Sequence, residues 1–226
     1  MQRAVAVVEV PEERADACHR WFDELRLRRA ELSEAWTTAG LTSFAAWFQP
    51  DPAAFTVRVE SPSITAAREH LAESVSPFDR WFRDCEQKIL GASPLAPGAS
   101  VADLLVEYHP TQVDPLDLFI AAAMPLLPGR VAQYRQTITE GGRKDDALDR
   151  VRRWGLGRLD IWLHEHTDSA WAVYDAAGDL AHMLRDLATS DDEAMVSQRG
   201  FVKEMFGIDL ATSTFPLPTA AWSWTA

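Results

Sequence analysis

The residues best suited to acid–base chemistry lie close together in the stretch RLDIWLHEH, residues 158–166. Within it, Asp160 and His164 are four positions apart, and His164 and His166 are two positions apart. If the stretch is a β-strand, residues at even spacing project from one face, so the three side chains share a surface. An imidazole titrates near neutral pH. We therefore predict that His164 moves a proton as a general acid or base and that Asp160 positions it.

The two histidines are also potential metal ligands, because side chains two apart on a strand point the same way. His109 or Asp160 would have to supply a third ligand, and nothing in the spacing requires it. Two ligands do not define a metal centre. We predict no metal and no other cofactor. A solvent-exposed histidine at the end of a strand is the simpler interpretation of His164 and His166.

Aromatic side chains supply the other candidate binding groups, because the chain contains nine Trp residues. Rings on strands usually belong to a core, but a subset can form the flat apolar walls of a pocket for a planar ligand. We predict that Trp47 and Trp162 orient such a ligand. Tyr174, His109 and His166 are expected to line the same pocket.

Arg58 is the candidate for stabilising negative charge that develops on a ligand oxygen. A tryptophan N–H group could serve instead. The alternative for Arg58 is a surface ion pair with Glu60 or Glu107.

Composition and motifs exclude several classes of function. The chain has 22 basic and 34 acidic residues, a formal net charge of −12, so nucleic acid and anionic membranes are not expected partners. We find no phosphate-binding Gly-rich loop, no serine nucleophile elbow and no dinucleotide fingerprint. No apolar run approaches the roughly 18 residues of a membrane span. Cys18 and Cys85 fit buried free thiols, and we predict a cytoplasmic protein.

An internal repeat organises the chain. A constant offset of 115 to 117 residues aligns the two halves along their full length. The matched pairs are Pro11 and Pro128, Gly40 and Gly155, Trp47 and Trp162, Leu71 and Leu187, Gly91 and Gly207, and Tyr108 and Trp224.

Each half shows the same order of hydrophobic patterns, which predicts strand, helix, strand, strand, helix, strand. In the first half the strands are AVAVVEV, SFAAWFQ, AFTVRVE and ADLLVEYHP, and in the second half they are LFIAAAMPL, RLDIWLHEH, AWAVYDA and AAWSWT. Long helices are expected to end near Gly40 and Gly91 and to span 129–154 and 179–206. A break is expected at Gly141 and Gly142, where the first half has an uninterrupted helix.

This order predicts an α+β fold of tandem ferredoxin-like βαββαβ repeats, residues 1–112 and 113–226. Each repeat would cover one face of its sheet with helices and leave the other bare, so the bare faces should pack together as a pseudo-dimeric α/β barrel. The fusion removes the need for a second chain, and we predict a monomer.

Alternation along the strands sorts the residues into two faces. Leu159, Ile161 and Leu163 should pack under helices. The opposite, polar face should line the barrel, and we assign to it Ser43, Trp47, Gln49, Thr56, Arg58, Glu107, His109, Asp160, Trp162, His164, His166 and Tyr174.

The first half resembles two families of the dimeric α/β-barrel superfamily. The segment RAELSEAWTTAGLTSFAAWFQPDPAAFTVRVES, followed by SVSPFDRWF, is similar to L-rhamnose mutarotases over roughly residues 4–90. That family's catalytic His falls on Leu25 here, and its neighbouring aromatic residue falls on Trp21, which the resemblance implies as a substrate-binding residue. Aromatic polyketide cyclases are similar in the hairpin and in an aromatic-rich last strand, AAWSWT. The superfamily also contains cofactor-independent monooxygenases.

Together these observations predict a cofactor-independent cyclase or isomerase that acts on a hydrophobic, polyketide-like small molecule by proton transfer in a barrel pocket. One alternative is a small-molecule binding protein that lost its catalytic His, as Leu25 indicates. The other alternative is a cofactor-independent monooxygenase.

Overall fold

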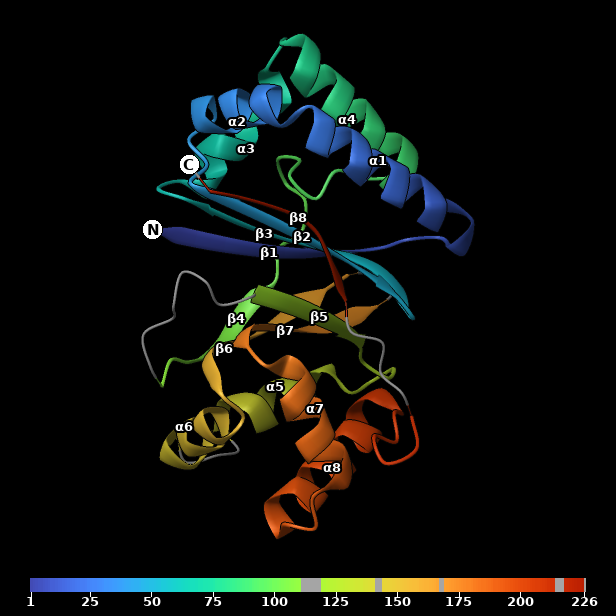
Figure 1. Ribbon diagram of the computed structural model, residues 1–226, viewed down its shortest axis with the longest axis vertical. Coiled ribbons are helices and arrows are strands. Elements are labelled where there is room, and N and C mark those ends of the chain that lie inside the picture. Colours follow the sequence, from blue (N-terminus) through green and yellow to red (C-terminus); the bar gives the residue numbers. More distant parts are fainter. Residues whose placement is uncertain (111–118, 141–143, 167–168, 214–217, 226) are drawn as a thin grey trace. The chain divides into compact units, whose positions relative to one another are not determined.

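The structure is a computed structural model that describes residues 1–110, 119–140, 144–166, 169–213 and 218–225. All eight predicted strands are confirmed (Figure 1). They are β1 (Gln2–Glu9), β2 (Ser43–Pro50), β3 (Ala53–Ser61), β4 (Asp103–Tyr108), β5 (Phe119–Pro125), β6 (Leu156–Glu165), β7 (Ala170–Gly178) and β8 (Thr219–Thr225). A 3₁₀ turn, η1 (Glu12–Arg14), follows β1.

Each predicted long helix is a pair of shorter helices. The pairs are α1 (Ala15–Leu27) with α2 (Arg29–Thr38), α3 (Ile64–Glu73) with α4 (Pro77–Leu90), α5 (Val131–Glu140) with α6 (Lys144–Arg153), and α7 (Leu180–Thr189) with α8 (Glu193–Phe206). The expectation of an unbroken first helix is therefore wrong. The break predicted at Gly141 and Gly142 falls between α5 and α6, and those two residues lie outside the described ranges.

Local chemistry explains the first-half breaks. Arg28 leaves the helical conformation at φ −99° and ψ 23°, and its guanidinium lies 4.0 Å from the centroid of the Trp81 ring. Ser63 caps α3 by accepting a hydrogen bond from the Ala66 N–H. Ser76 caps α4, whose first residue is Pro77, and proline is favoured at that position. Val75 lies in the gap between α3 and α4 and is 72% exposed.

Two matched glycines of the repeat end corresponding helices in the same backbone conformation. Gly91 ends α4 with φ +76°, and its counterpart Gly207 ends α8 with φ +71°. A left-handed residue after a helix favours glycine, because a side chain is strained there. The equivalence of these two positions supports the repeat that the sequence predicts.

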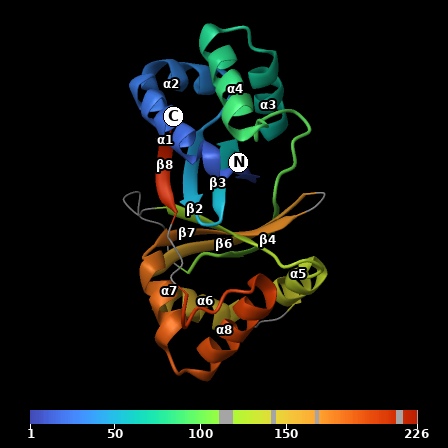
Figure 2. The same cartoon turned by 90° about the vertical axis from the view of Figure 1, so that its right-hand side faces the viewer.

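The strands form two antiparallel four-stranded sheets, in the orders β1-β3-β2-β8 and β4-β6-β7-β5. In each sheet one edge strand comes from the other half of the chain. Strand β8 lies beside β2, and β4 lies beside β6. Figure 2 shows β8, the last strand of the chain, lying beside β2, and the register pairs Phe44 with Trp224. The expectation that each repeat contributes all four strands of its own sheet is therefore wrong. The α+β class with tandem ferredoxin-like repeats is confirmed.

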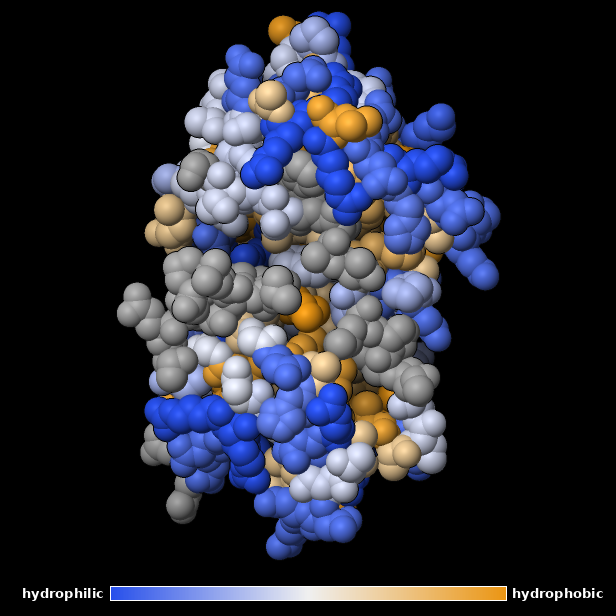
Figure 3. Space-filling model, viewed as in Figure 1, coloured by the Kyte–Doolittle hydropathy of each residue, from blue (hydrophilic) through white to orange (hydrophobic). Residues whose placement is uncertain are grey.

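The compact units reflect this exchange of strands. Unit 1 comprises Met1–Ala102 with Pro218–Ala226, and unit 2 comprises Asp103–Leu217. In unit 1, helices α1 to α4 cover one face of the sheet over a core rich in aromatic rings (Figure 1). In unit 2, helices α5 to α8 cover one face of the sheet over a core that is mostly aliphatic. Hydrophilic side chains cover much of the helical surface of both units in the view of Figure 3.

No helix within the described part of the chain is long and apolar enough to cross a membrane.

Candidate functional site

The main cavity of the described residues lies inside unit 2, between the sheet and its helices. Its volume is about 310 Å³. Its floor is formed by side chains from all four strands, among them Tyr108, Ala122, Leu159 and Tyr174. Its walls are apolar residues of α5 to α8 together with Trp154, whose indole nitrogen donates to Asp186 Oδ2 at 2.9 Å. A pocket of this size and polarity suits a hydrophobic small molecule.

The cavity exists because unit 2 has small side chains where unit 1 has large rings. In unit 1 the space between helices and sheet is filled by a continuous ring cluster that includes Trp21, Trp36, Phe44 and Phe82. At the repeat offset of 115 to 117 residues, these positions correspond in order to Ile138, Val151, Leu159 and Gln198, and all four line the unit 2 cavity. The smaller side chains leave a cavity, because the surrounding helices do not move inward to fill the volume of the missing rings.

A pair of tyrosines supplies the polar group on the cavity floor. Tyr134, fully buried on α5, donates from its hydroxyl to the Tyr174 hydroxyl across 3.0 Å. Because the Tyr174 oxygen accepts this bond, its own O–H group can donate to a ligand. Burial raises the pKa of Tyr174 to about 12 and holds the pKa of Tyr134 well above its usual value, so both phenols are protonated at neutral pH.

Tyr108 and Arg150 form a second polar group in the lining. Burial raises the pKa of the Tyr108 phenol, and the positive charge of Arg150 partly opposes that shift. The phenol of Tyr108 and the guanidinium of Arg150 therefore line the same cavity. Among the described lining residues there is no carboxylate, imidazole, thiol or amine.

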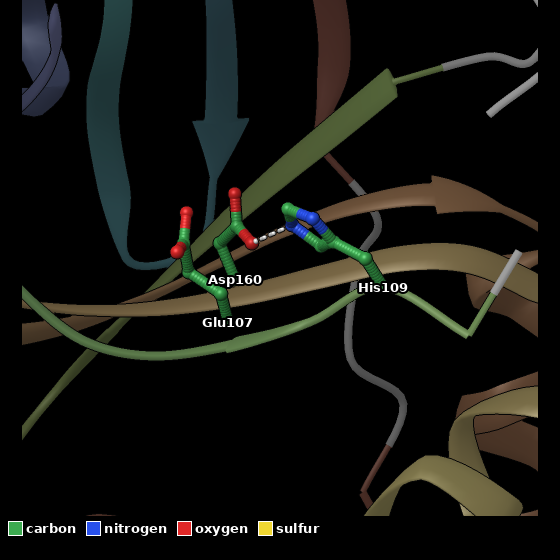
Figure 4. Close-up of side chains that lie close together, drawn as sticks. All are labelled: Glu107, His109 and Asp160. Atoms are coloured by element: carbon green, nitrogen blue, oxygen red, sulfur yellow. Dashed lines mark hydrogen bonds and ion pairs between the residues drawn. The ribbon is translucent and has the colours of Figure 1, made fainter. Parts of the chain in front are cut away.

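The opposite face of the unit 2 sheet carries a buried charge network. Arg158 donates to Asp160 Oδ2 at 2.6 Å and to Asp175 Oδ2 at 2.8 Å. His109 Nε2 lies 2.9 Å from Asp160 Oδ1 (Figure 4). Asp160 and Asp175 are 0% exposed, and Arg158 supplies the positive charge between them. Such a network is costly to break, because removal of one partner leaves a buried charge uncompensated.

Glu107, His109 and Asp160 bring one potential ligand atom each to within 4.8 Å of one another (Figure 4). Both oxygens of Asp160 already have partners, the guanidinium of Arg158 and the imidazole of His109. A metal ion bound here would have to compete with a cation that is already in contact with its central ligand. The chemistry of these residues therefore does not fit a metal centre.

The structure distributes the predicted site residues of the second half over both faces of the sheet. Leu159, Ile161 and Leu163 pack in the helix-covered core as predicted. Tyr174 was expected on the opposite face, but it pairs with Ile161 in register and therefore lies on the helix side, in the cavity. Trp162 is buried, and it lies on the face that carries Asp160.

His164 is 1% exposed, so it is not a solvent-exposed strand end, whereas His166 is exposed. Their ring centroids are 4.1 Å apart. Asp160 lies four residues before His164, which is about 13 Å along an extended strand and too far for a direct hydrogen bond. Asp160 instead contacts His109 and Arg158.

Three predicted residues of the first half, Trp21, Trp47 and Arg58, are buried and belong to unit 1. Trp47 and Arg58 lie on the face away from the helices, and the Arg58 guanidinium is 5.8 Å from the Trp47 ring centroid. Trp21 lies in the aromatic core with its ring stacked on Phe22. Leu25 is 1% exposed in the same core.

Sequence reasoning missed Tyr134, Tyr108 and Arg150. Tyr134 and Arg150 lie on helices, and their roles depend on which helix faces surround the cavity. A usable signal existed in the repeat itself, because a comparison of matched core positions shows aromatic rings in one half and smaller residues in the other.

The fold and the site define an α+β protein of two ferredoxin-like units, with one ligand-sized cavity in unit 2. No protein-family model matches the sequence, and no curated protein matches it either. The resemblance to mutarotases and polyketide cyclases therefore stays a prediction.

Solved structures with this architecture are known. A crystal structure of a candidate monooxygenase from Fusobacterium nucleatum subsp. nucleatum is similar with a TM-score of 0.52 and 10% identity, over 99% of this chain and 93% of that chain. A candidate monooxygenase from Lactobacillus acidophilus gives a TM-score of 0.50 and 9% identity, over 100% and 97%. An anthrone oxidase-like protein gives 0.49 and 12%, over 99% and 92%. At these identities the likeness describes the fold alone.

Proposed function

We propose that this protein binds a hydrophobic ring compound in the unit 2 cavity and catalyses its cofactor-independent isomerisation or cyclisation through an enolate. The observation that supports this proposal most directly is a protonated Tyr174 that can donate into an apolar cavity of about 310 Å³.

The hydroxyl of Tyr174 donates to a ligand carbonyl oxygen, and Tyr134 orients it from behind. As a proton leaves the carbon next to the carbonyl, negative charge develops on that oxygen, and the hydrogen bond strengthens in the low-dielectric cavity. A phenol with a pKa of about 12 keeps its proton during this step. Arg150 adds positive charge to the same lining. The described lining supplies no basic side chain, so in this scheme water accepts the carbon-bound proton and returns a proton to the enolate to complete the isomerisation.

The proposal assigns the reacting group to Tyr174 instead of His164. His164 lies on the other face of the sheet, so it cannot contact a ligand that the helices cover. The expected role of Asp160 as a positioning group also changes, since Asp160 belongs to the network with Arg158.

A non-catalytic binding protein is the second candidate. The observation that favours it is the lack of a carboxylate or imidazole among the described lining residues. The cavity would then only hold its ligand, and Tyr174 would select compounds that carry an acceptor oxygen.

The test uses 1-tetralone, a bicyclic ketone with exchangeable hydrogens next to its carbonyl. Quenching of tryptophan fluorescence measures binding, and deuterium uptake from D₂O, followed by mass spectrometry, measures enolisation. We expect Tyr174→Phe to retain binding and to lose about 10²-fold in the exchange rate. Val151→Trp restores a ring at a matched core position and should abolish both signals, whereas Val196→Trp, at an exposed site on α8, should change neither.

The outcomes separate the candidates. Binding without protein-dependent exchange supports the binding protein and contradicts catalysis. Oxygen consumption in the presence of the ketone would instead support oxygenation, the chemistry in the names of two similar structures. Binding that survives Val151→Trp would refute the assignment of the cavity.

A further inference from the structure

A second cavity lies in unit 1, between α3, α4 and the segment after α4. Its volume is about 100 Å³. Most of its wall is apolar, with Leu71, Phe82 and Leu95 among the lining residues. Three charged or ionisable side chains of α4 reach the same cavity, namely Asp79, Arg83 and Glu86.

Glu86 is the polar lining residue of this cavity that has one carboxylate oxygen available to a ligand. Its side chain is 2% exposed, and its Oε2 accepts a hydrogen bond from the Ser93 hydroxyl at 2.5 Å. Among the residues that the structure describes, the hydrogen bond from Ser93 is the one made to this carboxylate, and it leaves Oε1 open to a ligand. Burial raises the pKa of Glu86 to about 8, although Ser93 and the charge of Arg83 favour the ionised form. Glu86 therefore carries a proton at pH 7 when the cavity holds no cation.

The neighbouring ionisable groups are already satisfied. Asp79 accepts hydrogen bonds from the hydroxyls of Ser74 and Ser76. Arg83 donates to the backbone carbonyls of Leu71 and Ser74. The lining of the cavity therefore holds two carboxyl groups, Asp79 and Glu86, and one guanidinium, Arg83.

Arg68 of α3 lies beside the cavity and is also committed. It donates to the backbone carbonyls of Leu95, Ala96 and Ala99. Among the described groups, no cationic side chain donates a hydrogen bond to the Glu86 carboxylate.

We propose that this cavity binds a small primary alkylammonium ion, with its charged head on Glu86 and Ser93 and its short carbon chain against Leu71, Phe82 and Leu95. The ammonium group supplies three N–H donors, which the Glu86 carboxylate and the Ser93 hydroxyl can accept. A dry cavity of about 150 Å³ accommodates benzene, so about 100 Å³ corresponds to about four heavy atoms. Propylammonium has that size.

Binding of the ammonium ion displaces the proton of Glu86. The protonated Glu86 releases its proton to solvent when the ammonium ion enters, so the carboxylate and the ammonium form a neutral pair. Each ligand bound at pH 7 therefore releases close to one proton, and affinity increases as the pH rises toward 8.

The experiment titrates the full chain with propylammonium chloride in phosphate buffer, with thermal unfolding as one readout. We expect a saturable rise in Tm for the natural protein and at least a tenfold weaker apparent affinity for Glu86→Gln. The matched variant Glu73→Gln, an exposed carboxylate on α3, should behave like the natural protein. Calorimetry at pH 7 in two buffers of different ionisation enthalpy counts the released protons.

Several results would overturn the proposal. They are the lack of a saturable effect, an equal response in Glu86→Gln, and an equal response to 1-propanol, which has the same size without the charge. Potassium chloride at matched concentration must also have no comparable effect. The site lies in unit 1 and does not depend on the function proposed for the unit 2 cavity.

Discussion

Glu86 should make the stability of the protein decrease as the pH rises from 4.5 to 8. The pKa of this carboxyl is raised from 4.5 to about 8 in the folded state. Below pH 4.5 the folded and unfolded states both hold the proton, so the group contributes no difference. Between these values the unfolded chain loses the proton and the folded chain keeps it. The free energy of unfolding should therefore fall by about 1.4 kcal/mol per pH unit, or about 5 kcal/mol in total.

The replacement Glu86→Gln removes this dependence, because glutamine is neutral in both states and has nearly the same shape. We expect the variant and the natural protein to be similarly stable at pH 4.5. At pH 8 the variant should be more stable by up to about 5 kcal/mol, less any loss in its hydrogen bond to Ser93. Urea unfolding at half-unit pH steps, in buffers free of primary amines, measures the difference between the two proteins.

The comparison isolates one group, because every other titration is common to the two proteins. Glu73→Gln provides the control, and its stability profile should parallel that of the natural protein. If the profiles of Glu86→Gln and the natural protein also run parallel from pH 4.5 to 8, Glu86 is ionised in the folded state and the reasoning about its burial is incorrect.

Two further predictions concern the backbone and the charge network. Arg158→Leu should cost about 3–5 kcal/mol in urea unfolding, because the buried Asp160 and Asp175 both lose the guanidinium that contacts them. Arg152→Leu, at an exposed site, should cost less than about 0.5 kcal/mol. Gly207→Ala should lower the free energy of unfolding by about 1 kcal/mol, since φ is +71° there, and an unchanged Tm would refute that strain.

The pattern of alternation in RLDIWLHEH was sufficient to assign the faces of β6. Leu159, Ile161 and Leu163 pack under helices, while Asp160 joins the network on the other face. Tyr174 was placed on the wrong face, because its strand contains near-continuous apolar residues and its register is set by pairing with β6. A period of two gives no answer where both faces of a strand are buried.

The sequence pattern could not predict the breaks in the helices or the exchange of strands between the sheets. The apolar period continues from Leu71 to Phe82, although Pro77 starts a new helix between them. The choice of partner for β4 and β8 depends on long-range pairing, and either sheet could satisfy the hydrophobic pattern of an edge strand. The cavity was invisible to a search for chemical motifs, since what creates it is the small size of Ile138 and Val151.

The exchanged strands also determine the order in which the units can be completed during synthesis. Residues 1–102 leave the ribosome first, but their sheet lacks β8 until residues 219–225 have been made. Unit 2 needs only residues 103–217, so the unit begun second is the first that can close its sheet. Until then the edge of β2 is an open strand with unpaired backbone groups, which can pair with another chain. The nascent first unit is therefore the stage at which this protein most needs protection from aggregation.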